Sequence, residues 1–324
     1  MITVSILIHE DVVLSSACGP LDILTRTNQI LAAHGKPPRF QVELVSEKTK
    51  NILLSDPAQF ICHRTLAEVH HSDLIIVPAF KGDPDAVLEK NPALTGWIKA
   101  MHAQGAEIAS LCVGCFFLAE AGLLDGKPCT SHWKVIEDLR HRYPRIRLQP
   151  DTVLTDRDGI YTGGGAFSSL NLVLYLVEKF CGKEIGIQTS KNFSINPDQT
   201  SQAHFAVFQG QRRHGDRDIL KAQSFIEENY QNEISVEQIA GQSNMSKRNF
   251  IRRFKKATRN TPLEYLQRVK IEAAKKALED GSKSISVLMY DAGYNDMKTF
   301  RGIFKRVTGL TPQAYRAKYC SREW

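Results

Sequence analysis

Cys112 is the residue in this sequence whose setting best suits nucleophilic chemistry. An apolar run that ends at Leu111 leads directly into residues 112–115 (CVGC), and a helical pattern follows to residue 124. A strand, a sharp turn and a helix in this order place one side chain at a helix N-terminus. There the helix dipole and unpaired amides favour an anion and lower the pKa of a thiol. A buried small residue without a chemical role fits the same pattern, so both interpretations stay open.

Two other groupings near this turn are weaker candidates for chemistry. Cys112 and Cys115 have the spacing of a redox pair, but Gly114 and the two phenylalanines at 116–117 indicate that Cys115 packs inward. Residues 163–165 (GGG) lie between a strand and a helix, yet they lack the spacing of a phosphate-binding loop. We expect these glycines to allow the backbone to approach a ligand closely.

A metal site is not expected. The residues that suggest one are Cys62, His63, His70 and His71. Their spacing matches no common zinc pattern. The sequence therefore predicts neither a metal nor a cofactor.

The elements that would position Cys112 alternate between strands and helices. The expected strands are residues 2–8, 40–46, 73–78, 107–111, 146–148, 152–155 and 159–162, and the expected helices are 19–33, 86–104, 114–124 and 166–180. This alternation predicts an α/β unit, a mostly parallel sheet with helices on both faces. Ligands bind such sheets at the carboxyl ends of the strands. The relevant ends are those after Ile8, Val77 and Leu111.

The last third of the chain contains an internal repeat. Residues 250–265 (FIRRFKKATRNTPLEY) return as residues 300–315 (FRGIFKRVTGLTPQAY), with seven identical positions in an ungapped alignment. Each copy has a short helix, a turn and a second, basic helix, which is the pattern of a helix-turn-helix. The sequence thus predicts an all-α unit with two such motifs.

The helices of the two motifs are bounded by recognisable caps. Ser235 opens the first helix of the first motif, residues 244–246 form its turn, and Ser246 caps the second helix, 247–258. In the other motif the helices are 285–292 and 297–308, with Asp296 as the cap. A long helix over 262–278 joins the copies and spans on the order of 25 Å. It is long enough to hold two reading helices near the ~34 Å between successive major grooves.

The polar faces of the two second helices are the expected DNA contacts. These contacts are Ser246, Lys247, Arg248, Asn249, Arg252, Arg253, Lys256, Asn295, Asp296, Lys298, Thr299, Arg301, Lys305 and Arg306. We expect Arg248, Arg252 and Lys298 to reach base edges. We expect Lys247, Lys256, Lys305 and Arg306 to contact phosphates.

Charge and cysteine content agree with this division. Residues 211–324 carry 23 Lys and Arg against 13 Asp and Glu, whereas the first 210 residues carry 19 against 22. A basic end on a mildly acidic body suggests a polyanionic partner, although solvated basic helices would give the same balance. Seven scattered cysteines form no disulfide framework and fit a reducing cytoplasm. The sequence has no apolar stretch of about 18 residues, so no membrane span is expected.

Residues 110–133 (SLCVGCFFLAEAGLLDGKPCTSHW) resemble the elbow of PfpI-like domains of the class I glutamine-amidotransferase type. They are most similar to the GlxA-type branch that is fused to AraC-type regulators, and residues 19–22, 162–182 and 201–205 match that branch. The resemblance implies a flavodoxin-like fold. It also implies a ligand pocket formed by Ser16, Gly82, Cys112, Val113, His132, Trp133 and Gly164.

Two departures from that family bear on catalysis. Catalytic members often carry a histidine directly after the cysteine, where this chain has Val113, and an acidic residue where it has Ser16. Without a neighbouring base, Cys112 lacks the nucleophile–base pair that hydrolysis requires. The expected domain is therefore a ligand sensor with no catalytic residues, and His132 lines its pocket.

The last third resembles the AraC/XylS DNA-binding domain over about 100 residues, on the segments 245–256, 261–278 and 293–316. Asn260 stands where that family usually has a glycine after the helix, and asparagine tolerates the left-handed conformation. Met289 and Tyr290 also depart from the usual small or aliphatic residues. The resemblance implies promoter DNA and RNA polymerase as partners.

Together these features predict a cytoplasmic transcriptional regulator, an activator and a homodimer, that responds to an unidentified small-molecule effector. The expected domains are residues 1–208, a hinge at 209–217, and residues 218–324. One alternative is a cysteine-dependent hydrolase or lyase tethered to a DNA-binding domain. Another is a constitutive architectural DNA-binding protein.

Overall fold

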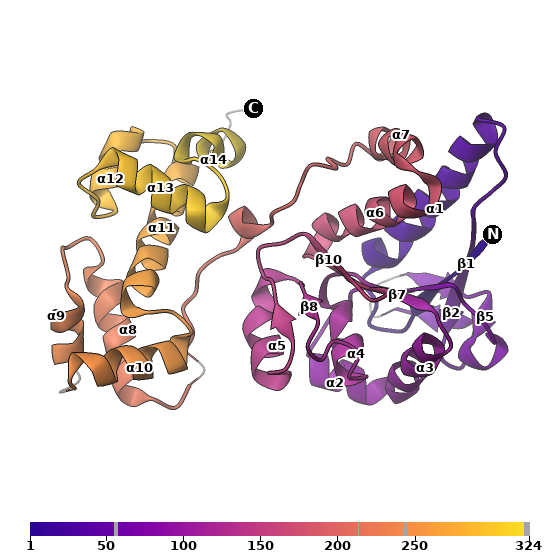
Figure 1. Ribbon diagram of the computed structural model, residues 1–324, viewed down its shortest axis with the longest axis horizontal. Coiled ribbons are helices and arrows are strands. Elements are labelled where there is room, and N and C mark those ends of the chain that lie inside the picture. The colour runs from indigo at the N-terminus through magenta and orange to yellow at the C-terminus, as the bar shows by residue number, and fades with distance from the viewer. Residues whose placement is uncertain (55–57, 213, 243–244, 321–324) are drawn as a thin grey trace. The chain divides into compact units, whose positions relative to one another are not determined.

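The chain forms two compact units, Met1–Gln202 and Ala203–Trp324, in a computed structural model (Figure 1). The structure describes residues 1–54, 58–212, 214–242 and 245–320. The first unit ends before the expected boundary at 208, because residues 203–208 pack with the second unit. Asn244, expected in the turn of the first motif, lies outside the described residues, as do Arg213 of the expected hinge and the last four residues.

The first unit is built on a seven-stranded sheet. In spatial order its strands are β10 (Leu154–Arg157), β11 (Ile160–Gly163), β7 (Glu107–Ser110), β6 (Leu74–Val77), β1 (Ile2–Ile8), β2 (Phe40–Ser46) and β5 (Arg64–Thr65). Only the edge pair β10–β11 is antiparallel; the other pairs are parallel. Two small sheets accompany it, β3 (Asn51–Leu53) with β4 (Gln59–Ile61) and β8 (Pro128–Cys129) with β9 (Arg147–Leu148). The predicted mostly parallel sheet is confirmed.

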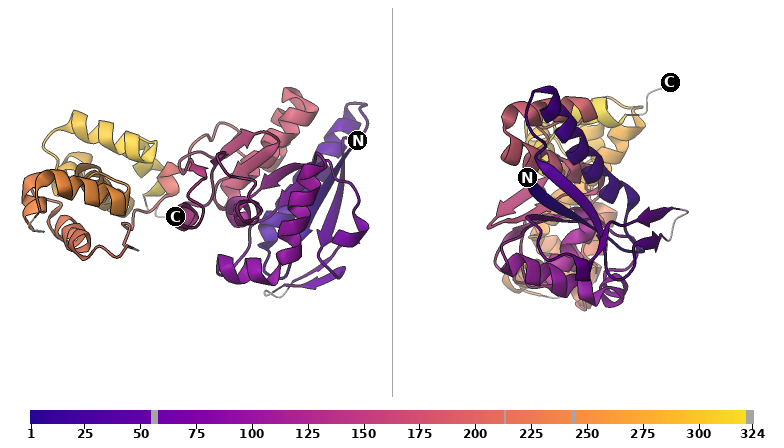
Figure 2. Two further views of the ribbon diagram at one scale, coloured as in Figure 1. Left: turned by 60° about the horizontal axis from the view of Figure 1, so that its bottom comes forward. Right: turned by 90° about the vertical axis from the view of Figure 1, so that its right-hand side faces the viewer.

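Helices cover both faces of this sheet, as the views in Figures 1 and 2 show. One face carries α1 (Leu14–Ala33), α6 (Leu170–Cys181) and α7 (Lys183–Phe193) over one apolar core. The other carries α2 (Pro84–Lys90), α3 (Pro92–Ala103), α4 (Cys115–Glu120) and α5 (Ile136–Arg142) over a second core. The strands between the two cores are apolar because both of their faces are buried.

Proline explains two differences from the expected helices. The predicted helix 86–104 is divided into α2 and α3 at Asn91, because a residue before proline disfavours the helical conformation. The first helix begins at Leu14 rather than at residue 19, and Pro20 lies inside it. Gly19 and Pro20 usually mark a boundary, so the sequence predicted the start too late.

The second unit consists of seven described helices. They are α8 (Arg217–Asn229), α9 (Val236–Gly241), α10 (Lys247–Thr258), α11 (Pro262–Asp280), α12 (Ile285–Asp291), α13 (Met297–Thr308) and α14 (Pro312–Tyr319). The long helix α11 runs between the two motifs (Figure 1). Its Tyr265 and Leu266 belong to the core of the first motif, and its Ile271, Ala274 and Leu278 belong to that of the second.

The two motifs repeat down to single hydrogen bonds. Thr258 Oγ1 donates to Phe254 O at 2.9 Å, and Thr308 Oγ1 donates to Phe304 O at 2.8 Å. The matched aromatic pairs agree as well, with ring centroids 5.4 Å apart for Phe254–Tyr265 and 5.5 Å apart for Phe304–Tyr315. The internal repeat of the sequence is therefore a repeat of structure.

The left-handed residue that ends α10 is Arg259, with φ of 59°, and not Asn260 as expected. Gly309 holds the same position after α13, with φ of 76°. Asn260 instead donates from Nδ2 to Thr258 O at 2.7 Å. The expectation was one residue out of register, because an arginine gives no sequence signal for positive φ.

Candidate nucleic-acid interface and elbow cysteine

Cys112 lies in a strained turn at the carboxyl end of β7. It begins the 3-10 turn η2 (Cys112–Gly114) with a positive φ of 55°, and its side chain is 7% exposed. Burial raises the pKa of the Cys112 thiol to about 11, although hydrogen bonds from the Ala166 and Val113 amides act in the opposite direction. Of the two interpretations left open for Cys112, the raised pKa favours the buried residue without a chemical role, because desolvation of the thiolate exceeds its stabilisation by nearby amides.

Gly114 and Cys115 are explained by packing. A Cβ atom at Gly114 would lie 2.6 Å from the carbonyl oxygen of Pro78, so only glycine fits beside β6. The Cys115 side chain is fully buried and interacts with Cys129, and burial raises its pKa well above the ordinary value. The inward packing predicted for Cys115 is confirmed.

The side chains expected around Cys112 have other partners. Ser16 Oγ accepts a hydrogen bond from Ala79 N at 2.8 Å. The half-buried His132 accepts one at Nδ1 from Lys134 N at 3.2 Å, and burial, with a smaller effect of Lys134, lowers the pKa of the imidazole. Among the described residues, no hydrogen bond joins the Cys112 thiol to an imidazole or a carboxylate. The geometry offers no activated thiolate.

The remaining members of the predicted ligand set lie at different depths. Trp133, which opens the 3-10 turn η3 (Trp133–Val135), is half-buried with its ring centroid 5.3 Å from that of His132. Val113 is half-buried, Gly164 is buried against Gln202, and Gly82 is exposed with φ of 92°. Two surface hollows of the described residues lie elsewhere, one of about 520 Å³ between α1 and α7 and one of about 440 Å³ on α8.

His9 is a residue of this edge that the sequence interpretation missed. It follows the last residue of β1, is 4% exposed, and has no hydrogen-bond partner for either ring nitrogen among the described atoms. Its ring lies 6.3 Å from that of Phe80 and 5.6 Å from that of Phe117. Burial lowers the pKa of His9 to about 4, against a smaller effect of Asp11, so the ring is neutral at pH 7. Its position directly after a buried strand was the available signal.

The first motif presents its basic face on α10. Arg248, Arg252 and Lys256 are exposed, and Arg252 donates to Asn249 Oδ1 at 2.9 Å. Lys247 is exposed and pairs with Glu237 of α9. Ser246 occupies the predicted N-cap position, but its side chain makes no capping hydrogen bond.

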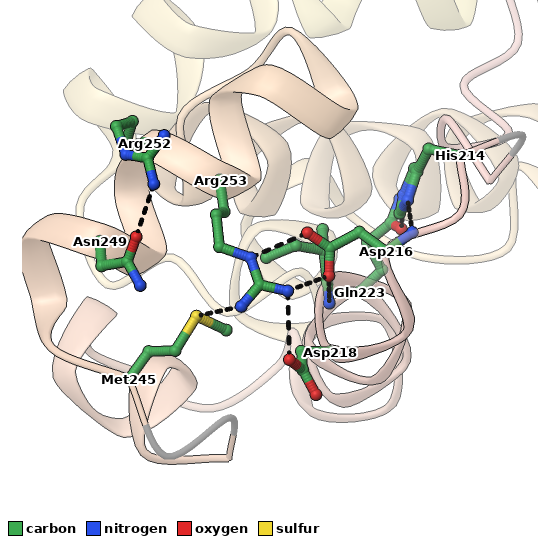
Figure 3. Close-up of polar contacts among 9 residues, drawn as sticks. His214, Asp216, Asp218, Gln223, Met245, Asn249, Arg252 and Arg253 are labelled. Atoms are coloured by element: carbon green, nitrogen blue, oxygen red, sulfur yellow. Dashed lines mark hydrogen bonds and ion pairs between the residues drawn. The ribbon is translucent and has the colours of Figure 1, made fainter.

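Arg253 points away from that face. Its guanidinium binds Asp216 at 2.9 and 2.7 Å and Asp218 at 3.2 Å, and it also lies 3.0 Å from the sulfur of Met245 (Figure 3). The partners belong to the start of α8 and the turn before α10. The structure therefore uses this arginine to hold the first motif together.

The second motif presents Lys298, Thr299, Arg301 and Lys305 as exposed side chains of α13. Asp296 caps this helix as predicted, accepting from Thr299 N at 2.6 Å. Two other expected DNA contacts have partners within the unit. Asn295 donates to Glu233 at 2.8 Å, and Arg306 donates to Gln267 at 2.7 Å.

The described residues form neither a membrane-spanning helix nor a metal-binding cluster. No helix there is both long and apolar enough to cross a membrane. No group of three or more His, Cys, Asp or Glu side chains is placed to hold a metal ion.

A parallel-sheet unit with an elbow cysteine, followed by a duplicated helix-turn-helix, defines the class of AraC-type helix-turn-helix proteins with a PfpI-like domain. The profile of the DJ-1/PfpI family matches residues 3–179, and that of a helix-turn-helix domain matches residues 239–318. The chain belongs to the DJ-1/PfpI family.

Curated relatives carry regulator names. The chain is 25% identical over 224 residues to the HTH-type transcriptional regulator GbdR of Pseudomonas aeruginosa, an alignment that covers 68% of this chain and 60% of that protein. It is 23% identical over 256 residues to CdhR of the same species, another HTH-type regulator, with 76% of each covered. A relative with an enzyme name is the isonitrile hydratase of Pseudomonas putida, 30% identical over 165 residues, with 51% of this chain and 65% of that protein covered.

Solved structures share the fold. A crystal structure of an AraC family transcriptional regulator from Pseudomonas putida aligns with a TM-score of 0.52 at 22% identity, covering 60% of this chain and all of that one. A putative transcriptional regulator protein from Vibrio parahaemolyticus aligns with a TM-score of 0.53 at 22% identity, covering 60% and 99%.

Proposed function

We propose that this protein is a cytoplasmic, sequence-specific DNA-binding transcriptional regulator. The observation that carries the proposal is the duplicated helix-turn-helix, in which α10 and α13 each expose a basic face while one helix, α11, joins their cores. The regulator names of GbdR and CdhR support it. Base edges are read by Arg248 and Arg252 in the first motif and by Lys298 in the second. Phosphates are held by Lys247, Lys256, Lys305 and Arg306.

Selection of duplexes from a random pool by the full chain tests this proposal. We expect a two-part sequence to be enriched, because one chain presents two reading helices. A pool that stays random after repeated rounds would reject sequence-specific binding.

The first unit is proposed to be a sensor that binds a small-molecule effector near Cys112 and forms a homodimer. In support, the elbow of the family fold is intact, while the thiol has a raised pKa and no base among the described residues is bonded to it. An effector acts only if it binds two regulatory states unequally. A metabolite panel that left the thermal midpoint of the full chain unchanged would count against the sensor.

The regulator is also proposed to act as an activator that recruits RNA polymerase. A promoter-fusion assay with and without the protein tests this role, because an activator raises expression from the promoter and a repressor lowers it.

The second candidate function is cysteine-dependent catalysis, which the similarity to an isonitrile hydratase favours. Turnover of isonitriles or small amides by the purified chain, lost in Cys112→Ala, would support it. The buried thiol, whose pKa is raised, argues against turnover.

A further inference from the structure

The segment that joins the two units is fastened to the DNA-binding unit along its length. We call residues 203–212 the strap. The carbonyl oxygen of Ala206 accepts from Lys275 Nζ at 2.5 Å, and Phe208 N donates to Glu272 Oε2 at 3.1 Å. Lys275 is 3% exposed and lies 3.0 Å from Glu272. Burying a lysine ammonium group costs free energy unless the group is hydrogen-bonded or paired. The carbonyl oxygen of Ala206 in the strap supplies one of these partners to Lys275.

The two ends of the strap reach different motifs. Near its start, inside the 3-10 turn η5 (Ala203–Phe205), the buried His204 lies with Nε2 3.0 Å from Lys318 Nζ of α14, a helix that packs with the second motif. Near its end, Gln211 O accepts at 2.9 Å from Gln223 Nε2 of α8, a helix that packs with the first motif. Between them, the ring of Phe208 packs edge-on against Tyr265 with centroids 5.1 Å apart. The strap therefore contacts helices that pack with each motif, and its last four residues, 209–212, lie in the segment 209–217 that the sequence predicted to be a hinge.

Gln202, the residue before the strap, is fastened equally well to the sensor unit. It is 1% exposed, and its Nε2 lies within 2.9–3.1 Å of Thr130 Oγ1 and the carbonyl oxygens of Ser131, Pro150 and Thr152. Its Oε1 accepts from Gly165 N at 2.9 Å. One amide side chain thus holds three loops together.

Two of those loops are also bonded to Cys112. Ser131 Oγ donates to Cys112 O at 2.7 Å, and the backbone carbonyl oxygen of the same Ser131 accepts a hydrogen bond from Gln202 Nε2. On the other side, Ala166 N–H bonds the Cys112 thiol, and the preceding Gly165 N–H bonds Gln202. Each route from Cys112 to Gln202 therefore has two hydrogen bonds.

We propose that Gln202 and the strap couple the Cys112 loops to the two DNA-reading motifs. The inference rests on the proposed function, because it assigns a route to the effector control. A rearrangement of the loops at Ser131 or Gly165 breaks bonds of Gln202. Ala203 follows it directly, so the change reaches a segment whose contacts with α14, α11 and α8 set how the two motifs are held. Coupling of this kind is reciprocal, so disturbing the strap also changes the loops.

Hydrogen exchange of the full chain, resolved by mass spectrometry, tests the coupling without an effector or an operator. Gln202→Leu disturbs the sensor end, and Lys275→Met disturbs the strap while keeping an aliphatic side chain. Matched controls are Gln209→Leu, an exposed glutamine of the strap, and Lys276→Met, the exposed neighbour of Lys275.

We expect each variant to act across the 202/203 boundary. Gln202→Leu should speed exchange at Phe208, and Lys275→Met should speed it at Gly165, each about fivefold, the ratio for one ordinary hydrogen bond. The controls should change neither amide. If each variant changed exchange only on its own side of the 202/203 boundary, the coupling would be overturned, and the strap would only connect the two units. If Gln202→Leu does not fold, the Lys275→Met result at Gly165 decides alone.

Duplex selection separates failure of the coupling from failure of the proposed function. The wild-type chain should enrich two-part sites with one spacing, and Lys275→Met should accept additional spacings because the strap no longer braces the motifs. A single unchanged spacing in the variant would overturn the bracing role. Absence of any enrichment by the wild type rejects the regulator itself, whatever the exchange result.

Discussion

Arg253 of α10 and Asp216 before α8 are joined by two hydrogen bonds, Nε to Oδ2 at 2.9 Å and Nη2 to Oδ1 at 2.7 Å. Asp216 is also the N-cap of α8, accepting from Ile219 N at 3.3 Å. One carboxylate thus caps the first helix of the DNA-binding unit and positions the second helix of its first motif.

Replacing Asp216 should destabilise the first motif and remove part of its pH dependence. The capping bond alone contributes about 1 kcal/mol. Burial would raise the pKa of Asp216, but hydrogen bonds from Arg253 and Ile219 outweigh it and hold the pKa below its ordinary value. That contribution is present above the unfolded pKa of about 3.9 and is lost as the pH falls below it. Exchange of α8 amides in Asp216→Ala and in the wild-type chain, at pH 7 and at about pH 3, which is below the unfolded pKa, measures both effects. Glu228→Gln on the exposed side of α8 serves as the control.

Arg252→Ala should weaken binding to the selected site by roughly 1–3 kcal/mol while nonspecific binding changes less. Arg253→Ala is the matched neighbour, and it should lower stability while preserving the preference between bases, because its side chain is bound to Asp216 and Asp218. Fluorescence anisotropy measures the affinity of each variant for the selected duplex and for a scrambled duplex. Equal losses on the two duplexes for Arg252→Ala would refute base reading by this residue.

Lys256→Ala and Lys305→Ala should weaken binding to all duplexes alike. Each lysine is exposed on a reading helix, and each phosphate contact adds about 0.9 to the slope of log affinity against log salt. We therefore expect the slope to fall by about 0.9 in each variant. Lys221→Ala, an exposed lysine of α8, is the control. An unchanged slope would remove the residue from the phosphate contacts.

Arg259→Gly should stabilise the first motif by about 1 kcal/mol, because a non-glycine residue in the left-handed conformation is strained. Gly309→Arg, at the matching position of the second motif, should destabilise by a similar amount. Denaturant dependence of amide exchange in α10 and α13 reports each motif separately. A loss of stability in Arg259→Gly would show that the arginine side chain makes a compensating contact.

The Cys112 thiol should react slowly with iodoacetamide at neutral pH. With a pKa of about 11, roughly one thiol in ten thousand is ionised at pH 7. The rate should rise with pH toward that value, and the urea-unfolded chain provides the reference for an accessible cysteine. Peptide mapping by mass spectrometry assigns the labelled residue. Folded-state labelling of Cys112 at pH 7 as fast as in the unfolded chain would contradict a buried thiol.

Local periodicity was sufficient to predict six of the seven strands of the main sheet and both motifs, but not the two-residue strand β5 or the strands β3, β4 and β8 of the small sheets. Buried parallel strands are short apolar runs, and α10 and α13 separate apolar from basic residues at helical spacing, so each can be located from its own residues. The helix α7 was missed because its polar sequence, KEIGIQTSKNF, becomes half-buried only through contact with α1 and α6.

The residues of the candidate sites also divide into those that local sequence predicts and those whose setting depends on distant residues. Exposure of Arg248 or Lys298 follows from its helix face alone. The inward turn of Arg253 depends on Asp216, a residue 37 positions away. The pKa of Cys112 likewise depends on how deeply its turn is covered, which no nearby residue indicates. The hydrogen bonds of Gln202 join residues up to 72 positions apart, and a single sequence contains no sign of them.

The sharing of α11 fixes the phase between the two reading helices. The Tyr265 hydroxyl donates to Glu227 of α8, and the matching Tyr315 hydroxyl donates to Glu279 near the end of α11. The end of α11 therefore packs with the second motif in the position that α8 has beside the first. One residue inserted into this helix would rotate the second reader by about 100° and advance it by about 1.5 Å. Insertions into α11 that approximate whole helical turns would therefore keep the two basic faces in phase, whereas single-residue insertions would not.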